Sequence, residues 1–218
     1  MEKKFIATTL AGLFVRSDPW AKAHEVWFEQ KAEQLNDPSI KDWIKRSDYF
    51  QGVDEVMKRI IPHATEEERT KKAREEYFDS VEIYLTQNKH LKNDKVIEYF
   101  KTLKNKYHIA LITTTKRDRI AEILSILEIT ELFDSIETSL PEEKDDKILV
   151  FERFIQKQGN PVLYIGGPKI ATYLYCKQKN IPYVFANLEH VKEVDDIPTI
   201  NSLEKLKEKI ESLKEILF

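Results

Sequence analysis

The sequence is poor in cysteine, glycine and long apolar runs, and it has no marked excess of either charge. Its single cysteine, Cys176, excludes an intramolecular disulfide and favours a reducing compartment. No apolar stretch approaches the ~18 residues of a membrane-spanning helix. The 35 basic and 38 acidic residues nearly balance, so nothing attracts the chain generally to nucleic acid or to an anionic membrane. We therefore expect a cytoplasmic protein whose partners are neither nucleic acids nor membranes.

The first residues imitate a secretion signal, because Met1–Lys4 is basic and the apolar run Phe5–Val15 follows it. Thr8 and Thr9 interrupt that run, which favours a different interpretation. We predict a buried strand over residues 4–9, followed by a tight turn at Leu10-Ala11-Gly12.

Residues 17–88 carry only helical signals. Ser17-Asp18-Pro19 provides a helix start with an early proline, and Thr65-Glu66-Glu67-Glu68 has the pattern of a capping box. Apolar residues then recur at helical spacing, and nothing in this stretch alternates with the period of a strand. We therefore predict an all-helical insert at 17–88 within a domain formed by 1–16 and 89–218.

The rest of the chain alternates short apolar runs with amphipathic segments. The runs predict strands, and the amphipathic segments between them predict helices. Expected strands are 109–112, 135–138, 162–165 and 183–185, and expected helices include 119–127, 148–156, 169–179 and 203–217. Repeated β–α units predict an α/β fold with a doubly wound parallel sheet, in which ligands bind beyond the carboxyl ends of the strands.

Four segments at the predicted strand ends resemble the signatures of the haloacid dehalogenase-like (HAD) hydrolase superfamily, in particular its phosphatase-like members with a helical C1-type cap. Thr9-Leu10-Ala11-Gly12-Leu13-Phe14 stands where that family has D-x-D-G-(T/V)-L, and 111–117 resembles its second motif. Leu127–Asp134 is similar to a family segment that precedes a conserved lysine, and Tyr164–Ala171 stands where the family has G-D-x-x-x-D. The resemblance implies a Rossmannoid core with 17–88 as its cap.

The same resemblance implies that the catalytic carboxylates are missing. In the family, the first aspartate attacks phosphorus, the second acts as acid and base, and acids of the first and fourth motifs hold Mg²⁺. The corresponding positions here are Thr9, Ala11, Gly167 and Ala171, so no catalytic position is intact. Mg²⁺ would be expected from the family, but its ligands are absent, and we expect no cofactor.

The family's anion-binding residues have counterparts that remain. Thr114 matches the second motif, and Lys144 or Lys147 could supply the conserved lysine. The candidates for binding phosphate or another anion are Gly12, Thr114, Thr115, Lys144 and Lys147, and Lys116, Arg117 and Lys169 would add positive charge at the same edge. The crevice beyond the carboxyl ends of the strands is therefore either a metal-independent anion-binding site or a vestigial site without a function.

The sequence favours a non-catalytic pseudophosphatase that acts as a binding, regulatory or structural subunit. One alternative is a metal-independent sensor of a phosphorylated metabolite. Another is a phosphatase with an unorthodox or weak site, for which Asp18, Asp118 or Asp145 could enter the crevice.

Two aromatic groups and a leucine series admit both a functional and a structural interpretation. The first aromatic group could line a ligand pocket under the cap, and the second could stack a nucleobase or cover a protein interface. His24 could act as a base, and the leucine series could be a partner-binding coiled-coil seam. Core packing is favoured for the aromatic groups and the leucine series, and a packed or surface position for His24. The residues are Trp20, Trp27 and Phe28; Tyr173, Tyr175, Tyr183 and Phe185; and Leu203, Leu206, Ile210, Leu213 and Leu217.

Overall fold

The computed structural model describes residues 3–46, 49–140, 143, 146–167, 169–192 and 196–216. The chain divides into two compact units, one made of residues 1–16 and 90–218 and the other of residues 17–89.

The larger unit is built on a six-stranded sheet with the order β3-β2-β1-β4-β5-β6, and every pair of neighbours is parallel. The strands are β1 (Lys4–Thr8), β2 (Tyr107–Lys116), β3 (Ser135–Ser139), β4 (Leu163–Gly166), β5 (Tyr183–Ala186) and β6 (Thr199–Ile200). The doubly wound parallel sheet expected from the sequence is confirmed. The sequence analysis missed β6, because two residues are too few to show a strand's period.

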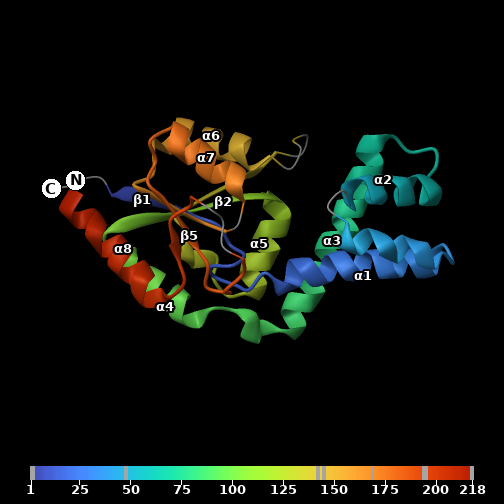
Figure 1. The fold of residues 1–218 in the computed structure, drawn as a ribbon, viewed down its shortest axis with the longest axis horizontal. Helices are drawn as coiled ribbons and strands as arrows, with labels where there is room; N and C mark the ends of the chain where they lie inside the picture. Colours follow the sequence, from blue (N-terminus) through green and yellow to red (C-terminus); the bar gives the residue numbers. More distant parts are fainter. Residues whose placement is uncertain are drawn as a thin grey trace. The chain divides into compact units, whose positions relative to one another are not determined.

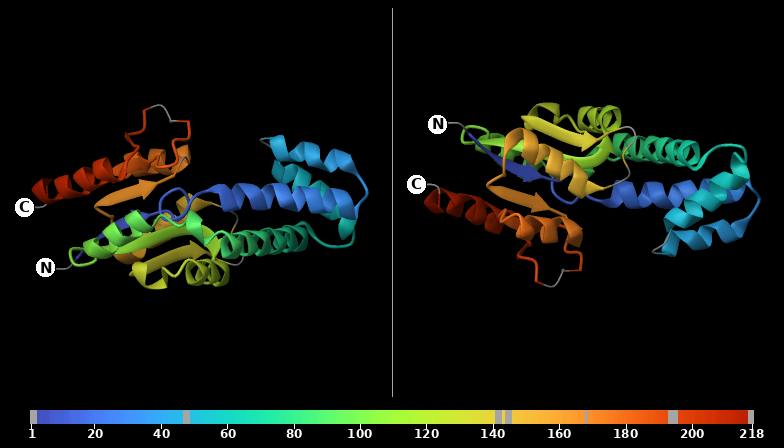
Figure 2. Two further views of the ribbon diagram at one scale, coloured as in Figure 1. Left: turned by 90° about the horizontal axis from the view of Figure 1, so that it is seen from below. Right: turned by 90° about the horizontal axis from the view of Figure 1, so that it is seen from above.

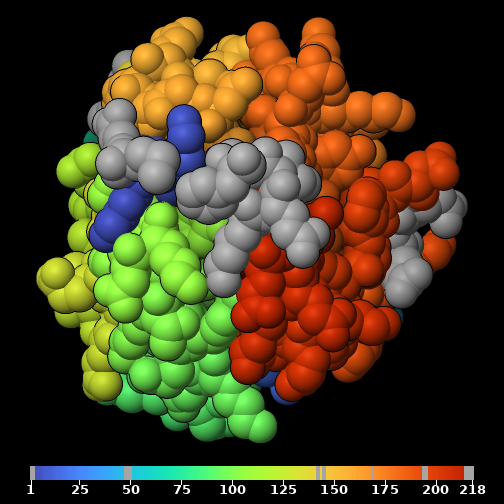
Figure 3. All heavy atoms as spheres, turned by 90° about the vertical axis from the view of Figure 1, so that its left-hand side faces the viewer, coloured from blue at the N-terminus to red at the C-terminus, as the bar shows by residue number. Residues whose placement is uncertain are grey.

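Helices cover both faces of this sheet (Figure 1). They are α4 (Asp94–Leu103), α5 (Arg117–Ile126), α6 (Lys147–Gln158), α7 (Ile170–Gln178) and α8 (Leu203–Ile216), with short 3-10 turns η2 (Lys89–Leu91) and η3 (Thr130–Leu132). Figures 1 and 2 show α6 and α7 together on one face and α4 and α8 on the other. In Figure 3, α4 (green) and α8 (red) lie side by side, and Lys207 Nζ of α8 lies 5.4 Å from the centre of the Tyr99 ring of α4.

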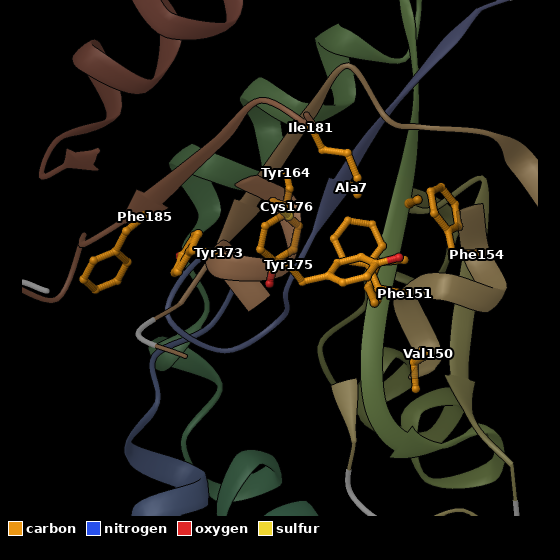
Figure 4. Close-up of a cluster of buried hydrophobic side chains, with 12 residues drawn as sticks. Ala7, Val150, Phe151, Phe154, Tyr164, Tyr173, Tyr175, Cys176, Ile181 and Phe185 are labelled. Carbon is orange, nitrogen blue, oxygen red and sulfur yellow. The ribbon is translucent and has the colours of Figure 1, made fainter. Parts of the chain in front are cut away.

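The face under α6 and α7 is packed with aromatic side chains (Figure 4). Phe151 of α6 and Tyr173 of α7 are almost fully buried beside Tyr164 of β4, and Phe154 of α6 is buried beside Phe5 of β1. The aromatic group at 173–185 is therefore core, as favoured from the sequence. Leu206, Ile210 and Leu213 of α8 are also buried, which confirms packing for that part of the leucine series, while Leu217 lies outside the described residues.

The smaller unit consists of α1 (Asp18–Gln34), η1 (Pro38–Lys45), α2 (Tyr49–Ile60) and α3 (Glu66–Gln87). No strand occurs in its described residues, as predicted. The expected capping box opens α3, because Glu68 N donates to Thr65 Oγ1 at 3.2 Å and Thr65 N donates to Glu68 Oε2 at 2.7 Å. Trp27 and Phe28 are buried among these helices, which confirms their structural interpretation.

In the part of the chain that the structure describes, no helix is both long enough and apolar enough to cross a membrane.

Candidate functional site

The first residues of the candidate site follow β1, which lies between β2 and β4 in the middle of the sheet. Thr9 N donates to Ile165 O at 3.1 Å, so the chain stays beside β4 for one residue beyond β1. It then turns sharply, with Phe14 N donating to Leu10 O at 3.0 Å and Gly12 N to Val15 O at 2.8 Å. Gly12 has φ +80°, a left-handed conformation that glycine adopts without strain.

Lys147 reaches the site from the first turn of α6. Its Nζ donates a hydrogen bond to Thr9 Oγ1 at 3.2 Å, although the two residues are 138 positions apart in the sequence. Asp146 caps this helix, because its side chain accepts a hydrogen bond from Ile148 N at 2.8 Å. The cap fixes the start of α6 at Lys147. Of the two lysines expected to fill the third motif, Lys147 therefore lies at Thr9, and Lys144 lies outside the described residues.

The aromatic ring of Tyr164 lies close to the Lys147 ammonium group. Lys147 Nζ lies 5.6 Å from the centre of the Tyr164 ring, a distance at which a cation is attracted to the ring face. Burial raises the pKa of Tyr164 well above its ordinary value, so the phenol stays neutral. Burial also raises the pKa of Cys176 to about 12, and the charge of Lys147 opposes that change. Tyr164 and Cys176 therefore both stay uncharged near Lys147.

The two glycines at the end of β4, Gly166 within the strand and Gly167 after it, have different surroundings. A Cβ on Gly166 would come within 2.6 Å of the Tyr164 ring, so that ring lies over Gly166 and extends toward the carboxyl edge of the sheet. A Cβ on Gly167 would lie 3.7 Å from Ala11 O and 3.9 Å from Thr9 Cγ2, which are ordinary contact distances. Gly167 therefore borders the first motif with room for a side chain. Its carbonyl accepts a hydrogen bond from Tyr173 Oη at 2.6 Å.

Thr114 and Thr115 belong to β2, which ends later than the sequence analysis predicted. Thr114 and Thr115 were expected to follow a strand ending at residue 112, but β2 continues to Lys116. Three consecutive β-branched residues, 113–115, favour the extended backbone and account for the difference. The pairing with β3 is irregular there, passing from Thr113 opposite Thr138 to Lys116 opposite Ser139. Thr115 is buried, and Thr114 is half-buried.

The remaining charged candidates lie at helix starts. Lys116 and Arg117 precede or open α5, and Lys169 is an exposed residue just before α7. Ala171 is exposed in the first turn of α7. Of the acids considered for an unorthodox site, Asp118 is exposed on α5, Asp18 opens α1 of the smaller unit, and Asp145 lies outside the described residues.

The four motif positions do not fit Mg²⁺. They offer the hydroxyl of Thr9 and main-chain carbonyls, whereas magnesium sites in proteins are built on carboxylates. Among the described residues, no group of three or more His, Cys, Asp or Glu side chains is arranged to hold a metal.

Sequence analysis missed two features around these residues. The first is the contact between Lys147 and Tyr164, for which the only signal was a glycine two positions after a tyrosine on the same face of a strand. The second is a cavity of about 240 Å³ beside the turn after β1, lined in part by Gly12, Arg16, Glu189 and His190. Arg16 Nε and Glu189 Oε1 are 3.9 Å apart across it.

Known structures share this architecture across nearly the whole chain. A haloacid dehalogenase-like hydrolase from Streptococcus pneumoniae has 16% identity and a TM-score of 0.63, with 95% of this chain and 98% of that chain covered. A HAD hydrolase from Bacillus subtilis, solved with magnesium bound, has 12% identity, a TM-score of 0.63 and coverage of 97% and 100%. A HAD phosphatase from Thermococcus onnurineus has 14% identity, a TM-score of 0.62 and coverage of 96% and 98%. At these identities the likeness establishes the fold.

A search of curated proteins gives no match. The model of the haloacid dehalogenase-like hydrolase family matches residues 21–184, a range that begins after Thr9 and Ala11 but includes Lys147 and Gly167. Because the match covers more than half of the 218 residues, this chain belongs to the haloacid dehalogenase-like hydrolase family.

Proposed function

We propose that this chain is a non-catalytic member of its family that acts by binding. The observation that carries the proposal is the hydrogen bond from Lys147 Nζ to Thr9 Oγ1. An ammonium group has three donors and no acceptor, so it cannot take a proton from the threonine hydroxyl. A hydroxyl is a weak nucleophile unless a base activates it. At the position of the family's nucleophile, the chain therefore has a group that its neighbour does not activate.

The other motif positions add no chemistry of this kind. The methyl group of Ala11 can neither give nor accept a proton, and Gly167 and Ala171 provide no side-chain oxygen for a metal. Losses within one catalytic unit are not additive, but removing a single member already costs several orders of magnitude in rate. We expect hydrolysis of the family type to be absent.

The test is a restoration experiment. The wild-type chain is assayed with Mg²⁺ against a broad panel of phosphate esters, beside the variant Thr9→Asp/Ala11→Asp/Gly167→Asp. The third substitution fits because the space around Gly167 accepts a Cβ at 3.7 Å or more. We expect no turnover above the blank for the wild type and Mg²⁺-dependent turnover for the variant. The matched control adds Lys147→Met to the variant and should lose the gain.

Turnover by the wild-type chain would contradict the proposal. It would favour a phosphatase with an unorthodox site, and Asp118→Asn would then test whether the exposed acid of α5 takes part.

A second candidate function is metal-independent binding of a phosphorylated ligand. It is favoured by the half-buried Lys147, whose ammonium is held at the carboxyl edge of the central strand by Thr9 and the Tyr164 ring. Titration with inorganic phosphate without Mg²⁺, followed by NMR, should shift the resonances of Thr9 and Gly167. Lys147→Met should abolish these shifts, whereas Lys95→Met, at an exposed position of α4, should leave them. Unchanged spectra at millimolar phosphate would rule this candidate out.

A further inference from the structure

The outer side of α7 exposes two large aliphatic residues. Ile170 is 50% exposed and Leu174 is 61% exposed, and their spacing of four positions puts them on one side of the helix. The opposite side of the helix packs on the core, where Thr172, Tyr173 and Cys176 are buried. A helix on the surface of a globular domain normally has polar residues on its outer side. The apolar pair on α7 therefore needs a separate explanation.

Helix α6 exposes one further leucine. Leu149 is 45% exposed and lies in the first turn of α6, which shares one layer with α7 (Figures 1 and 3). Because α6 and α7 follow parallel strands of one sheet, their first turns lie at the same edge of that sheet. We call Ile170 and Leu174, with the neighbouring Lys169 and Lys177, the α7 surface.

Most charges around α7 are positive, although Glu152 of α6 acts electrostatically on Tyr175 of α7. The chain as a whole has 38 acidic residues, yet positions 153–188 contain none of them. The charged residues of that stretch are all cationic: Arg153, Lys157, Lys169, Lys177 and Lys179.

Three of these cations have partners outside the α7 surface. Arg153 and Lys157 bind Glu137 at 2.7 and 3.0 Å, and Lys179 lies 5.7 Å from the centre of the Tyr175 ring. The other two border the apolar pair. Lys177 is three positions after Leu174, on the same side of the helix, and Lys169 immediately precedes Ile170; both are exposed. The α7 surface is thus an apolar patch with positive charge at both ends.

We propose that the α7 surface is a docking site for a protein segment that presents aliphatic side chains flanked by Asp or Glu. The inference extends the binding role proposed above to a partner class. Aliphatic side chains would fill the contact with the patch, and carboxylates beside them would complement the two lysines and speed association.

Charge also distinguishes this partner from two other occupants. Two copies of the α7 surface would bring lysines together, and like charges in contact disfavour a self-association of this kind. Attraction to an anionic membrane usually takes clusters of about four to eight cations, whereas this surface has Lys169 and Lys177. The acidic protein segment fits both the apolar and the charged part of the surface.

The probe is a helical peptide with leucines at i, i+3, i+4 and i+7 and glutamates beside them, titrated into the isotope-labelled full-length chain. We expect NMR shifts concentrated at 169–178, and we expect the binding to weaken as salt is raised. The same peptide with lysines in place of glutamates should bind at least about tenfold more weakly.

Matched variants decide whether the α7 surface carries the binding. Ile170→Glu and Leu174→Glu should each weaken binding about tenfold. Ile83→Glu on α3 is the control, because Ile83 is the same residue type as Ile170, is 59% exposed and belongs to the other compact unit; its affinity should stay unchanged.

Three results would overturn the inference. They are no peptide binding at millimolar concentration, an equal loss in the Ile83→Glu control, and α7-dependent binding to vesicles of phosphatidylserine and phosphatidylcholine or to a second copy in preference to the peptide. The phosphatase assay is a separate readout, so failure here and failure of the non-catalytic role are distinguishable.

Discussion

Two adjacent glycines should respond in opposite ways to the same substitution. In Gly166→Ala, the new methyl group would lie 2.6 to 2.8 Å from three atoms of the Tyr164 side chain. That ring cannot move away easily, because Tyr164 is 1% exposed and its hydroxyl is hydrogen-bonded with Thr172. In Gly167→Ala, the nearest atom is 3.7 Å away. Neither glycine has a left-handed backbone that would strain an alanine.

The magnitudes follow from these distances. Overpacking a well-filled core costs about 1–3 kcal/mol. Replacing a glycine also removes freedom from the unfolded chain, which stabilises the fold by about 0.4–1 kcal/mol at a compatible position. We therefore expect Gly166→Ala to lower the free energy of unfolding by about 1–2 kcal/mol and Gly167→Ala to raise it by about 0.5 kcal/mol. For a chain of this size, 1 kcal/mol changes Tm by about 2–4 °C.

Urea denaturation followed by circular dichroism measures the difference between the two variants. Tryptophan fluorescence adds an internal control, because Trp20, Trp27 and Trp43 all lie in residues 17–89 and so report on the smaller unit. The reasoning is refuted if Gly166→Ala is as stable as the wild type, or if Gly167→Ala loses as much stability as Gly166→Ala. The first result would mean that the Tyr164 ring does not lie over Gly166, and the second that Gly167 has no room for a methyl group.

Three further predictions concern titratable groups. A hydrogen bond from Arg153 lowers the pKa of Glu143 below its ordinary 4.5, so this contact should stabilise the fold fully above pH 4.5 and be lost as pH falls through the lowered pKa. Arg153→Met should remove about 1–2 kcal/mol at neutral pH, together with that acid dependence, in denaturation curves recorded across pH. Burial lowers the pKa of His24 from 6.5, so stability should decline as pH falls below 6.5, where the unfolded chain binds the proton more readily; His24→Gln should lack this decline. Burial raises the pKa of Cys176 to about 12, so the native thiol should resist a thiol reagent at about pH 8 that labels it rapidly in urea, and fast labelling of the native chain would contradict its burial.

Much of the fold could be predicted from local sequence patterns. The capping box at Thr65 and the helical spacing of apolar residues predicted the helices of 17–88, and short apolar runs separated by amphipathic segments predicted the parallel sheet. These patterns are reliable because helices and strands bury one face with a fixed period, which is written into neighbouring residues. The strand β2 ran further than predicted, because 113–115 combine polar hydroxyls with β-branched carbons that favour extension.

The sequence by itself also determined what the site lacks. The residues at 9, 11, 167 and 171 have no carboxylate in any conformation, so this absence depends on residue identity alone.

Only the tertiary structure decided what these positions have instead. It brought Lys147 to Thr9 across 138 positions, laid the Tyr164 ring over Gly166, and left Ile170 and Leu174 on the outer side of a helix whose inner side is core. Contacts of this kind depend on which elements become neighbours in the sheet and on how their side chains fill the space between them. No local period in the chain records that arrangement, because it is fixed only when distant segments pack together.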